Sequence, residues 1–302
     1  MSGDTAAWVG ARLGAGWERH ARPEWLEGWT PHAFDLEGGR TEVVTLGAGE
    51  PLLLLPPLPG YKEAWLPVAA RLARRHRVIT FDLRARFAGP PSWEALLADL
   101  ERVADAFAAG PAVVVGHSLG AALAQRWALR HPDRVRALVL SSSFARVRHR
   151  AGHAWKRFVE QPLVLAGQRL LPESLAAPLA HACARRGLWV YDEACDEPVL
   201  AFVRHGIRTV RLADARAMVR LALAHDTATE LGGLAMPCLL LVGDRETAWA
   251  RGATAELRRL IPHADAIVLT RVAHLHPLSA PAAFVAAVEG WLMAKAGGPS
   301  TG

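Results

Sequence analysis

The chain has 302 residues, of which 51% are hydrophobic and 21% charged, a composition typical of a globular protein with a large buried core. The formal net charge is +6, but the basic residues are mostly scattered arginines with no basic run that alternates with aromatic residues, so we expect no nucleic-acid partner. We find no run of about 18 apolar residues, no signal pattern and no C-x-x-C spacing, so we expect no membrane span, no metal and a cytoplasmic location.

Apolar runs of strand length alternate with helical patterns along most of the chain. After an N-terminal segment to about residue 30, residues 41–47 and 51–56 predict the first two strands, which we expect to form an antiparallel lead-in. The elements that follow are predicted to be a helix over 61–76, a strand over 77–82, a helix over 93–110 and strands over 111–116 and 136–142. This alternation is typical of an α/β fold with a mostly parallel central sheet flanked by helices.

The pattern changes between residues 144 and 234, where helical stretches follow one another without a strand between them. Alternation then resumes, with strands predicted over 237–244 and 265–270 and helices over 249–261 and 281–294. We therefore expect one core, made of residues 1–143 and 235–302, and an inserted helical cap over residues 144–234.

Ser118 stands in the sequence GHSLG, residues 116–120, between a predicted strand and a predicted helix. A sharp turn there projects the serine above the sheet, and a glycine two positions away on either side relieves the crowding. The turn also places the hydroxyl at a helix N-terminus, where backbone N–H groups favour a developing negative charge. This context favours a nucleophilic serine over a serine that only begins a helix.

A serine hydroxyl needs a base to become a good nucleophile. The last predicted strand is followed by two histidines, His274 and His276. His274 comes first after the strand, whereas His276 precedes a proline that directs it elsewhere. We therefore expect His274 to be the base.

The base in turn needs an acid that holds its tautomer. The penultimate predicted strand leads into Asp244 and Glu246, and the strand over 136–142 is followed by no carboxylate within reach. We favour Glu246, because Asp244 directly follows a glycine and can instead cap the turn. Asp244 stays the alternative acid.

The loop after strand 51–56 is the expected source of an oxyanion donor. Its prolines have no N–H group, which leaves Leu58 and Gly60 as donors in that turn. We expect the N–H of Leu58 to act together with the N–H of Leu119, the residue after the nucleophile.

These motifs resemble those of the α/β-hydrolase family, in particular esterases with a helical cap. The segments GHSLG, RVITFDLR, LVGDRE and AHLHPLSAPAAF follow the family order of serine, acid and histidine over about residues 41–294. The resemblance implies that the acid, three residues after its glycine, is Glu246 and that the histidine opening its motif, His274, is the base. The chain departs from the family at Pro56-Pro57, where His-Gly is common, and at Glu246, where aspartate is commoner.

The motifs and the resemblance together predict a serine hydrolase that cleaves carboxylic esters through an acyl-enzyme on Ser118 and uses no cofactor. We expect a small-molecule ester with an apolar acyl group as substrate, and Phe144, Trp155 and Phe158 as the lining of its pocket. An acyltransferase or a biosynthetic thioesterase with the same triad is the alternative, and a non-catalytic ligand-binding protein is a third interpretation. The sequence leaves the natural substrate and the oligomeric state open.

Overall fold

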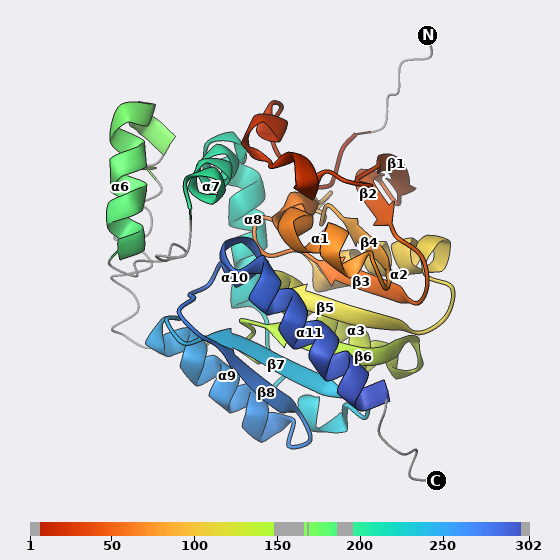
Figure 1. Ribbon diagram of the computed structural model, residues 1–302. Coiled ribbons are helices and arrows are strands. Elements are labelled where there is room, and N and C mark those ends of the chain that lie inside the picture. The colour runs from red at the N-terminus through yellow and green to blue at the C-terminus, as the bar shows by residue number, and fades with distance from the viewer. Residues whose placement is uncertain (1–6, 148–165, 168, 186–195, 297–302) are drawn as a thin grey trace.

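The computed structural model describes residues 7–147, 166–167, 169–185 and 196–296, and an eight-stranded sheet forms its centre (Figure 1). The strands lie in the order β1-β2-β4-β3-β5-β6-β7-β8. All pairs among β3 to β8 are parallel, whereas β2 pairs with β1 and β4 antiparallel. The predicted α/β fold with a mostly parallel sheet is confirmed. The strands are β1 (Pro31–Leu36), β2 (Gly39–Leu46), β3 (Pro51–Leu55), β4 (Arg77–Phe81), β5 (Ala112–His117), β6 (Val135–Ser141), β7 (Cys238–Gly243) and β8 (Asp265–Leu269).

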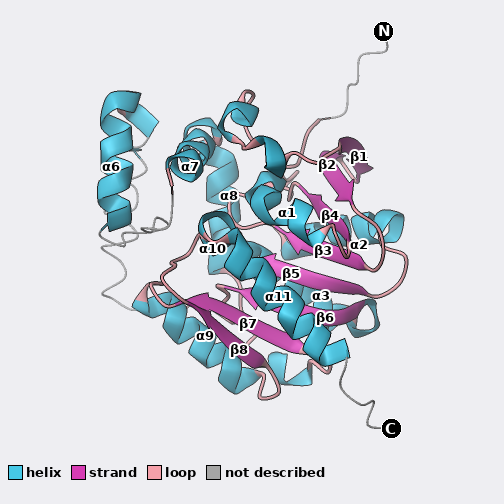
Figure 2. Ribbon diagram, viewed as in Figure 1, coloured by secondary structure: helices cyan, strands magenta, loops and turns pink. Residues whose placement is uncertain are grey.

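Helices cover both faces of this sheet (Figure 2). Helices α1 (Leu66–Leu72) and α11 (Pro281–Ala296) pack over one face, and α2 (Trp93–Phe107), α3 (Leu119–Arg130) and α9 (Ala248–Leu260) pack over the other. Strands β3 and β5 are buried along their whole length, and because both of their faces are covered, their sequences are continuous apolar runs. The edge strand β8 instead alternates between less and more exposed residues.

The structure corrects two predictions, one about the start of the sheet and one about the helix that follows β3. Strand β3 does not belong to an antiparallel lead-in, because it pairs in parallel with β4 and β5. The antiparallel hairpin is β1–β2, and the sequence analysis missed β1 because its mostly exposed residues PHAFDL give no clear apolar alternation. The predicted helix over 61–76 is also shorter: a 3-10 turn, Lys62–Trp65, leads into α1, whose first turn holds Pro67.

Between residues 144 and 234 the described part of the chain contains helices α6 (Glu173–Arg185), α7 (Glu197–Thr209) and α8 (Leu212–Leu223). The N-terminal segment packs against this helical region: the ring of Trp17 meets that of Phe202 edge-on, with 6.5 Å between centroids. The ring nitrogen Nε2 of His205 lies 2.8 Å from the carbonyl oxygen of Gly14. That residues 144–234 form a separate cap stays a prediction.

A helix that crosses a bilayer needs about 20 mostly apolar residues. Among the described residues, none of the helices combines the length and the apolar character that crossing a membrane requires.

Candidate active site

Ser118 forms the turn between β5 and α3, with φ +53° and ψ −113°. A positive φ is rare for a residue with a side chain, and it indicates a turn that its surroundings hold in place. The two flanking glycines are required by close backbone approach. A Cβ on Gly116 would lie 2.5 Å from Cα of Ala121, and a Cβ on Gly120 would lie 2.0 Å from the carbonyl oxygen of Leu55. The turn leaves Ser118 partly exposed at the carboxyl end of β5.

The carboxyl edge of the sheet brings the other expected site residues to the same end of the molecule as Ser118. Strand β3 flanks β5 on one side, and β6, β7 and β8 follow on the other. Because these strands are parallel, the loops that follow them all leave at one edge. The loops after β3, β7 and β8 carry Leu58, Glu246 and His274.

Glu246 and His274 form a hydrogen-bonded pair at this edge. Nδ1 of His274 lies 3.2 Å from Oε1 and 3.4 Å from Oε2 of Glu246. Since a carboxylate only accepts, Nδ1–H donates and Nε2 keeps its lone pair to take a proton. The His274 ring lies 5.0 Å, between centroids, from the ring of His117, which directly precedes Ser118. His274, the expected base, therefore lies beside the turn at Ser118.

Burial and charge act in opposite directions on this pair. Burial raises the pKa of Glu246, but the neighbouring His274 and a hydrogen bond from Ser142 outweigh it, so the pKa lies below its ordinary value. Burial lowers the pKa of His274, and the charge and hydrogen bond of Glu246 more than offset this, so that pKa is raised. Glu246 is thus a carboxylate, and His274 is a stronger base than a free histidine.

Asp244, the alternative acid, has a different place. It is exposed, and its Oδ1 accepts a hydrogen bond from the N–H of Val272 at 3.3 Å, which ties the loop after β7 to the loop after β8. Glu246 is 3% exposed and contacts the histidine directly. The geometry therefore favours Glu246.

Ser142, at the carboxyl end of β6, is a site residue that the sequence analysis missed. Its hydroxyl donates a hydrogen bond to Oε1 of Glu246, and its own backbone N–H donates to the carbonyl oxygen of Leu241 at 2.8 Å. The search for an acid after this strand points to carboxylates and so passes over a hydroxyl group. The serine run SSS, residues 141–143, is the sequence feature that points to it.

His276 is fully buried and joins three segments of the core. Its Nδ1 lies 3.0 Å from the carbonyl oxygen of Ala273, and its Nε2 lies 2.6 Å from Oγ of Ser141, which is 2.9 Å from Nδ1 of His117. Burial, with His274 and His276 close by, holds the pKa of His117 well below its ordinary value, so this ring is neutral. The contacts fix the loop that presents His274 to the ends of β5 and β6.

The loop after β3 presents Leu58 at its tip, where the residue is 38% exposed. The N–H of Gly60 donates to the carbonyl oxygen of Pro57 at 2.7 Å, so this N–H is used within the turn. Leu58 is then the better candidate of the two donors in the loop. Leu119 is the first residue of α3, and first-turn N–H groups have no acceptor within their own helix.

Of the three expected pocket residues, the described chain contains Phe144. It is 5% exposed, and its ring lies 5.3 Å from that of His225 and 5.7 Å from that of Trp249, between centroids. Trp155 and Phe158 lie outside the described residues. The role of all three as pocket lining stays a prediction.

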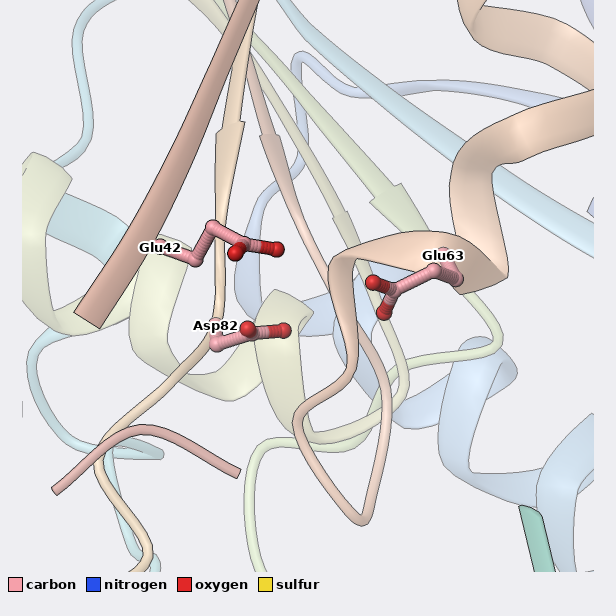
Figure 3. A group of neighbouring side chains, drawn as sticks. All are labelled: Glu42, Glu63 and Asp82. Atoms are coloured by element: carbon pink, nitrogen blue, oxygen red, sulfur yellow. The ribbon is translucent and has the colours of Figure 1, made fainter. Parts of the chain in front are cut away.

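A group of carboxylates with the spacing of metal ligands lies beside the Leu58 loop. Oxygen atoms of Glu42, Glu63 and Asp82 lie within 4.8 Å of one another, and Figure 3 shows the three side chains converging. The ammonium of Lys62 lies 2.6 Å from Glu42, 2.6 Å from Glu63 and 3.0 Å from Asp82. Lys62 therefore supplies the positive charge that a metal ion would bring to these carboxylates.

The chain matches known proteins over most of its length. A family model described as the alpha/beta hydrolase fold matches residues 50–278. A pimeloyl-[acyl-carrier protein] methyl ester esterase of Nitrosomonas europaea is 27% identical over 254 residues, which are 82% of this chain and 97% of that protein. A protein of Azorhizobium caulinodans named as a carbamate hydrolase is 37% identical over 105 residues, but these are 33% of this chain and only 40% of that relative.

Solved structures share the architecture. The enol-lactonase from Burkholderia xenovorans LB400 superposes with a TM-score of 0.70 over 87% of this chain and 100% of that chain, at 22% identity. At 22% identity, the structural similarity supports a shared fold and nothing more. The family match, by contrast, covers both the GHSLG turn and the segment that carries His274. The chain belongs to the α/β-hydrolase family.

Proposed function

We propose that this protein is a serine hydrolase that cleaves carboxylic esters, with Ser118 as nucleophile, His274 as base and Glu246 as the acid that orients the base. The observation that carries the proposal is the Glu246–His274 hydrogen bond at the sheet edge where Ser118 forms its positive-φ turn. Nucleophile, base and acid on three loops at one edge is the arrangement that acyl transfer to serine needs.

In the first half of the reaction, Oγ of Ser118 attacks the acyl carbon while Nε2 of His274 takes the hydroxyl proton. The carbonyl electron pair moves onto oxygen, where the N–H groups of Leu58 and Leu119 stabilise it, each by about 3 kcal/mol. Collapse of this intermediate breaks the bond to the alcohol, which leaves with the proton from His274. Water repeats the sequence on the acyl-enzyme and releases the acid.

Glu246 has two tasks in these steps. As a buried carboxylate on Nδ1 it holds the tautomer in which Nε2 can accept the serine proton. It also stabilises the positive imidazolium that forms when that proton arrives. Ser142 keeps one carboxylate oxygen in place through its hydrogen bond.

The substrate class follows from the apolar surroundings and from the relatives. The ring of Phe144, three residues after β6, lies 5.7 Å from that of Trp249, between centroids, and apolar side chains of this kind suit an apolar acyl group. The Nitrosomonas europaea relative is named for the cleavage of a methyl ester. We therefore include small esters with aliphatic acyl groups in the proposal.

The test is a set of initial rates on p-nitrophenyl esters of increasing acyl length, for the wild type and Ser118→Ala side by side. We expect turnover in the wild type and a loss of at least about 10⁴-fold in the variant, because the nucleophile is gone while the fold remains. Ser143→Ala, a change at another buried serine, is the matched control. Equal activity in Ser118→Ala and the wild type would refute the proposal.

The same reaction mixtures separate hydrolysis from acyl transfer. With a competing alcohol or amine present, a hydrolase gives mainly the free acid, because water attacks the acyl-enzyme. A product mixture dominated by the transferred acyl group would instead favour the acyltransferase alternative.

A further inference from the structure

Lys62 is a buried cation that three elements of the fold hold in place. It is 1% exposed, and its ammonium contacts Glu42 on β2, Glu63 in the 3-10 turn and Asp82 directly after β4. Asp82 also accepts a hydrogen bond from the backbone N–H of Lys62, with 3.1 Å between N and Oδ1. We call these four residues the Lys62 cluster.

The cluster lies at the end of the loop that presents Leu58, residues 56–61. Two residues before Lys62, the carbonyl oxygen of Gly60 accepts from the N–H of Leu83 at 2.9 Å. Together with the bond from the Lys62 N–H to the Asp82 side chain, this fixes the exit of the loop to the end of β4 through the backbone of two residues. The loop cannot shift at this end without breaking buried hydrogen bonds.

The entrance of the same loop is fixed by the nucleophile turn. The backbone of Leu55 and Pro56 passes so close to Gly120 that a Cβ there would lie 2.0 Å and 2.7 Å from their carbonyl oxygens. The loop is thus held between α3 on one side and the Lys62 cluster on the other. Its tip, with Leu58, is the part that remains exposed.

Three carboxyl groups surround the single ammonium of Lys62, and Nη2 of Arg12 lies 3.8 Å from Oε2 of Glu42. Burial raises the pKa of Asp82, the ammonium of Lys62 opposes this rise, and Glu63 adds to it. Burial lowers the pKa of Lys62, but Asp82, Glu63 and Glu42 outweigh this and raise it, so the ammonium stays charged. A buried charge set of this kind contributes little to the free energy of unfolding compared with apolar side chains of the same volume.

We propose that Lys62 and Asp82 are positioning residues that hold the loop over residues 56–61 so that the N–H of Leu58 points at the oxyanion. This inference rests on the function proposed above. An oxyanion donor acts in the transition state and contributes little to binding of the ground-state ester. Loosening the loop therefore lowers kcat and leaves KM nearly unchanged.

The test compares Asp82→Ala with the wild type in two assays. The first assay gives kcat and KM on a p-nitrophenyl ester. The second gives the rate constant for labelling of Ser118 by a fluorophosphonate, whose phosphoryl (P=O) oxygen occupies the position of the oxyanion. We expect kcat and the labelling rate constant to fall about 10- to 100-fold, with KM changed by less than about threefold. Asp82→Asn keeps an acceptor for the Lys62 N–H but loses the charge, so we expect an intermediate loss.

The chain offers a matched control in a second buried ion pair. Arg84 lies two residues beyond Asp82, and its Nε and Nη2 each lie 2.8 Å from Asp99, with no contact to residues 56–61 among the hydrogen bonds of the described residues. Arg84→Met/Asp99→Asn removes this pair. We expect its kcat and labelling rate to equal those of the wild type, even where its melting temperature changes.

The outcomes distinguish this inference from the proposed function. If the wild type neither turns over esters nor is labelled at Ser118, the proposed function fails and the role of the loop fails with it. If the wild type is active and a folded Asp82→Ala variant has the same kcat and labelling rate constant, the positioning role is overturned, whereas the proposed function stands. An equal loss in the Arg84→Met/Asp99→Asn control also overturns it, because the effect is then one of stability. Should Asp82→Ala not fold, Asp82→Asn decides by the same criteria.

Discussion

The two sides of Ser118 use charge in different ways. On the side of β6 to β8, the proposed acid and base, Glu246 and His274, contact each other, and the His274 side chain is 23% exposed. On the side of β3 and β4, Lys62 is 1% exposed and lies at the end of the loop over residues 56–61, whose proposed contribution to the site is the backbone N–H of Leu58. In the proposed mechanism the first side moves a proton, and the second side holds backbone dipoles in place.

This difference predicts different responses to mutation. Changes on the β6–β8 side alter the protonation chemistry and therefore the dependence of the rate on pH. Changes on the β3–β4 side alter geometry and therefore kcat without a shift in the pH profile. Variants on either side test this contrast, with the expected loss of turnover decreasing from His274→Ala to Glu246→Gln, Ser142→Ala and Asp99→Asn.

His274→Ala removes the base. We expect kcat/KM on a p-nitrophenyl ester to fall by about 10⁴-fold or more, because the serine proton has no acceptor. His263→Ala is the control, since that ring contacts the carbonyl oxygen of Met236 at 3.1 Å and plays no part in the mechanism. Comparable losses in the two variants would contradict the assignment of the base.

Glu246→Gln keeps the shape of the acid and removes its charge. We expect kcat to fall by about 10³-fold or more, because the amide no longer enforces the tautomer of His274. The charge of Glu246 raises the pKa of His274, and activity needs the neutral ring, so the acid limb of the pH–rate profile lies above the ordinary histidine value in the wild type. In the variant this limb shifts to lower pH.

Asp244→Asn is the matched control for that experiment. Its carboxylate caps a loop through Val272 and does not touch His274 in the hydrogen bonds of the described residues. We expect kcat within about threefold of the wild type, with an unshifted acid limb. A large loss of kcat in Asp244→Asn, together with an active Glu246→Gln variant, would assign the role of the acid to Asp244 instead of Glu246.

Ser142→Ala removes the hydrogen bond that holds Oε1 of Glu246. We expect kcat to fall roughly 3- to 10-fold, since one hydrogen bond to a charged group is lost while the acid remains. Ser143→Ala is the control, because the neighbouring hydroxyl contacts Gln125 at 2.8 Å instead. Steady-state kinetics of both variants at one pH measure the difference, and equal rates would remove Ser142 from the site.

Asp99→Asn leaves the buried guanidinium of Arg84 without its carboxylate. We expect a loss of about 3 kcal/mol in the free energy of unfolding, and a smaller loss in Arg84→Met/Asp99→Asn, because an unpaired buried charge costs more than an absent pair. Urea denaturation measures both values. Turnover should be unchanged in either variant if it is folded. A fall in kcat would contradict the view that the Lys62 cluster affects the site and the Arg84–Asp99 pair does not.

Local motifs made much of this fold and site predictable. The turn at Ser118 depends on residues within five positions, and a strand before it and a helix after it are readable from the same stretch. The order of serine, acid and histidine adds His274 and Glu246, because each follows a strand that ends at the same sheet edge. The antiparallel edge strand β1 was not predictable in this way, since its mostly exposed residues lack a periodic apolar pattern.

Long-range contacts made the remainder unpredictable. The Lys62 cluster joins residues 42, 62, 63 and 82, and no spacing rule connects a lysine in one loop with carboxylates from two distant strands. Ser142 reaches Glu246 across 104 positions, and nothing in the sequence states which strand ends become neighbours. Sheet order decides both, and it depends on how the whole chain packs.

The most direct test of the account is the site of labelling by a fluorophosphonate, mapped by peptide mass spectrometry in the wild type, Ser118→Ala and His274→Ala. The account predicts a single label on the peptide that contains Ser118, no label in Ser118→Ala and strongly slowed labelling in His274→Ala, because the base is needed to activate the hydroxyl. A label on another residue, or a folded wild type that takes up no label, would contradict the claim that Ser118, His274 and Glu246 act as one nucleophilic unit.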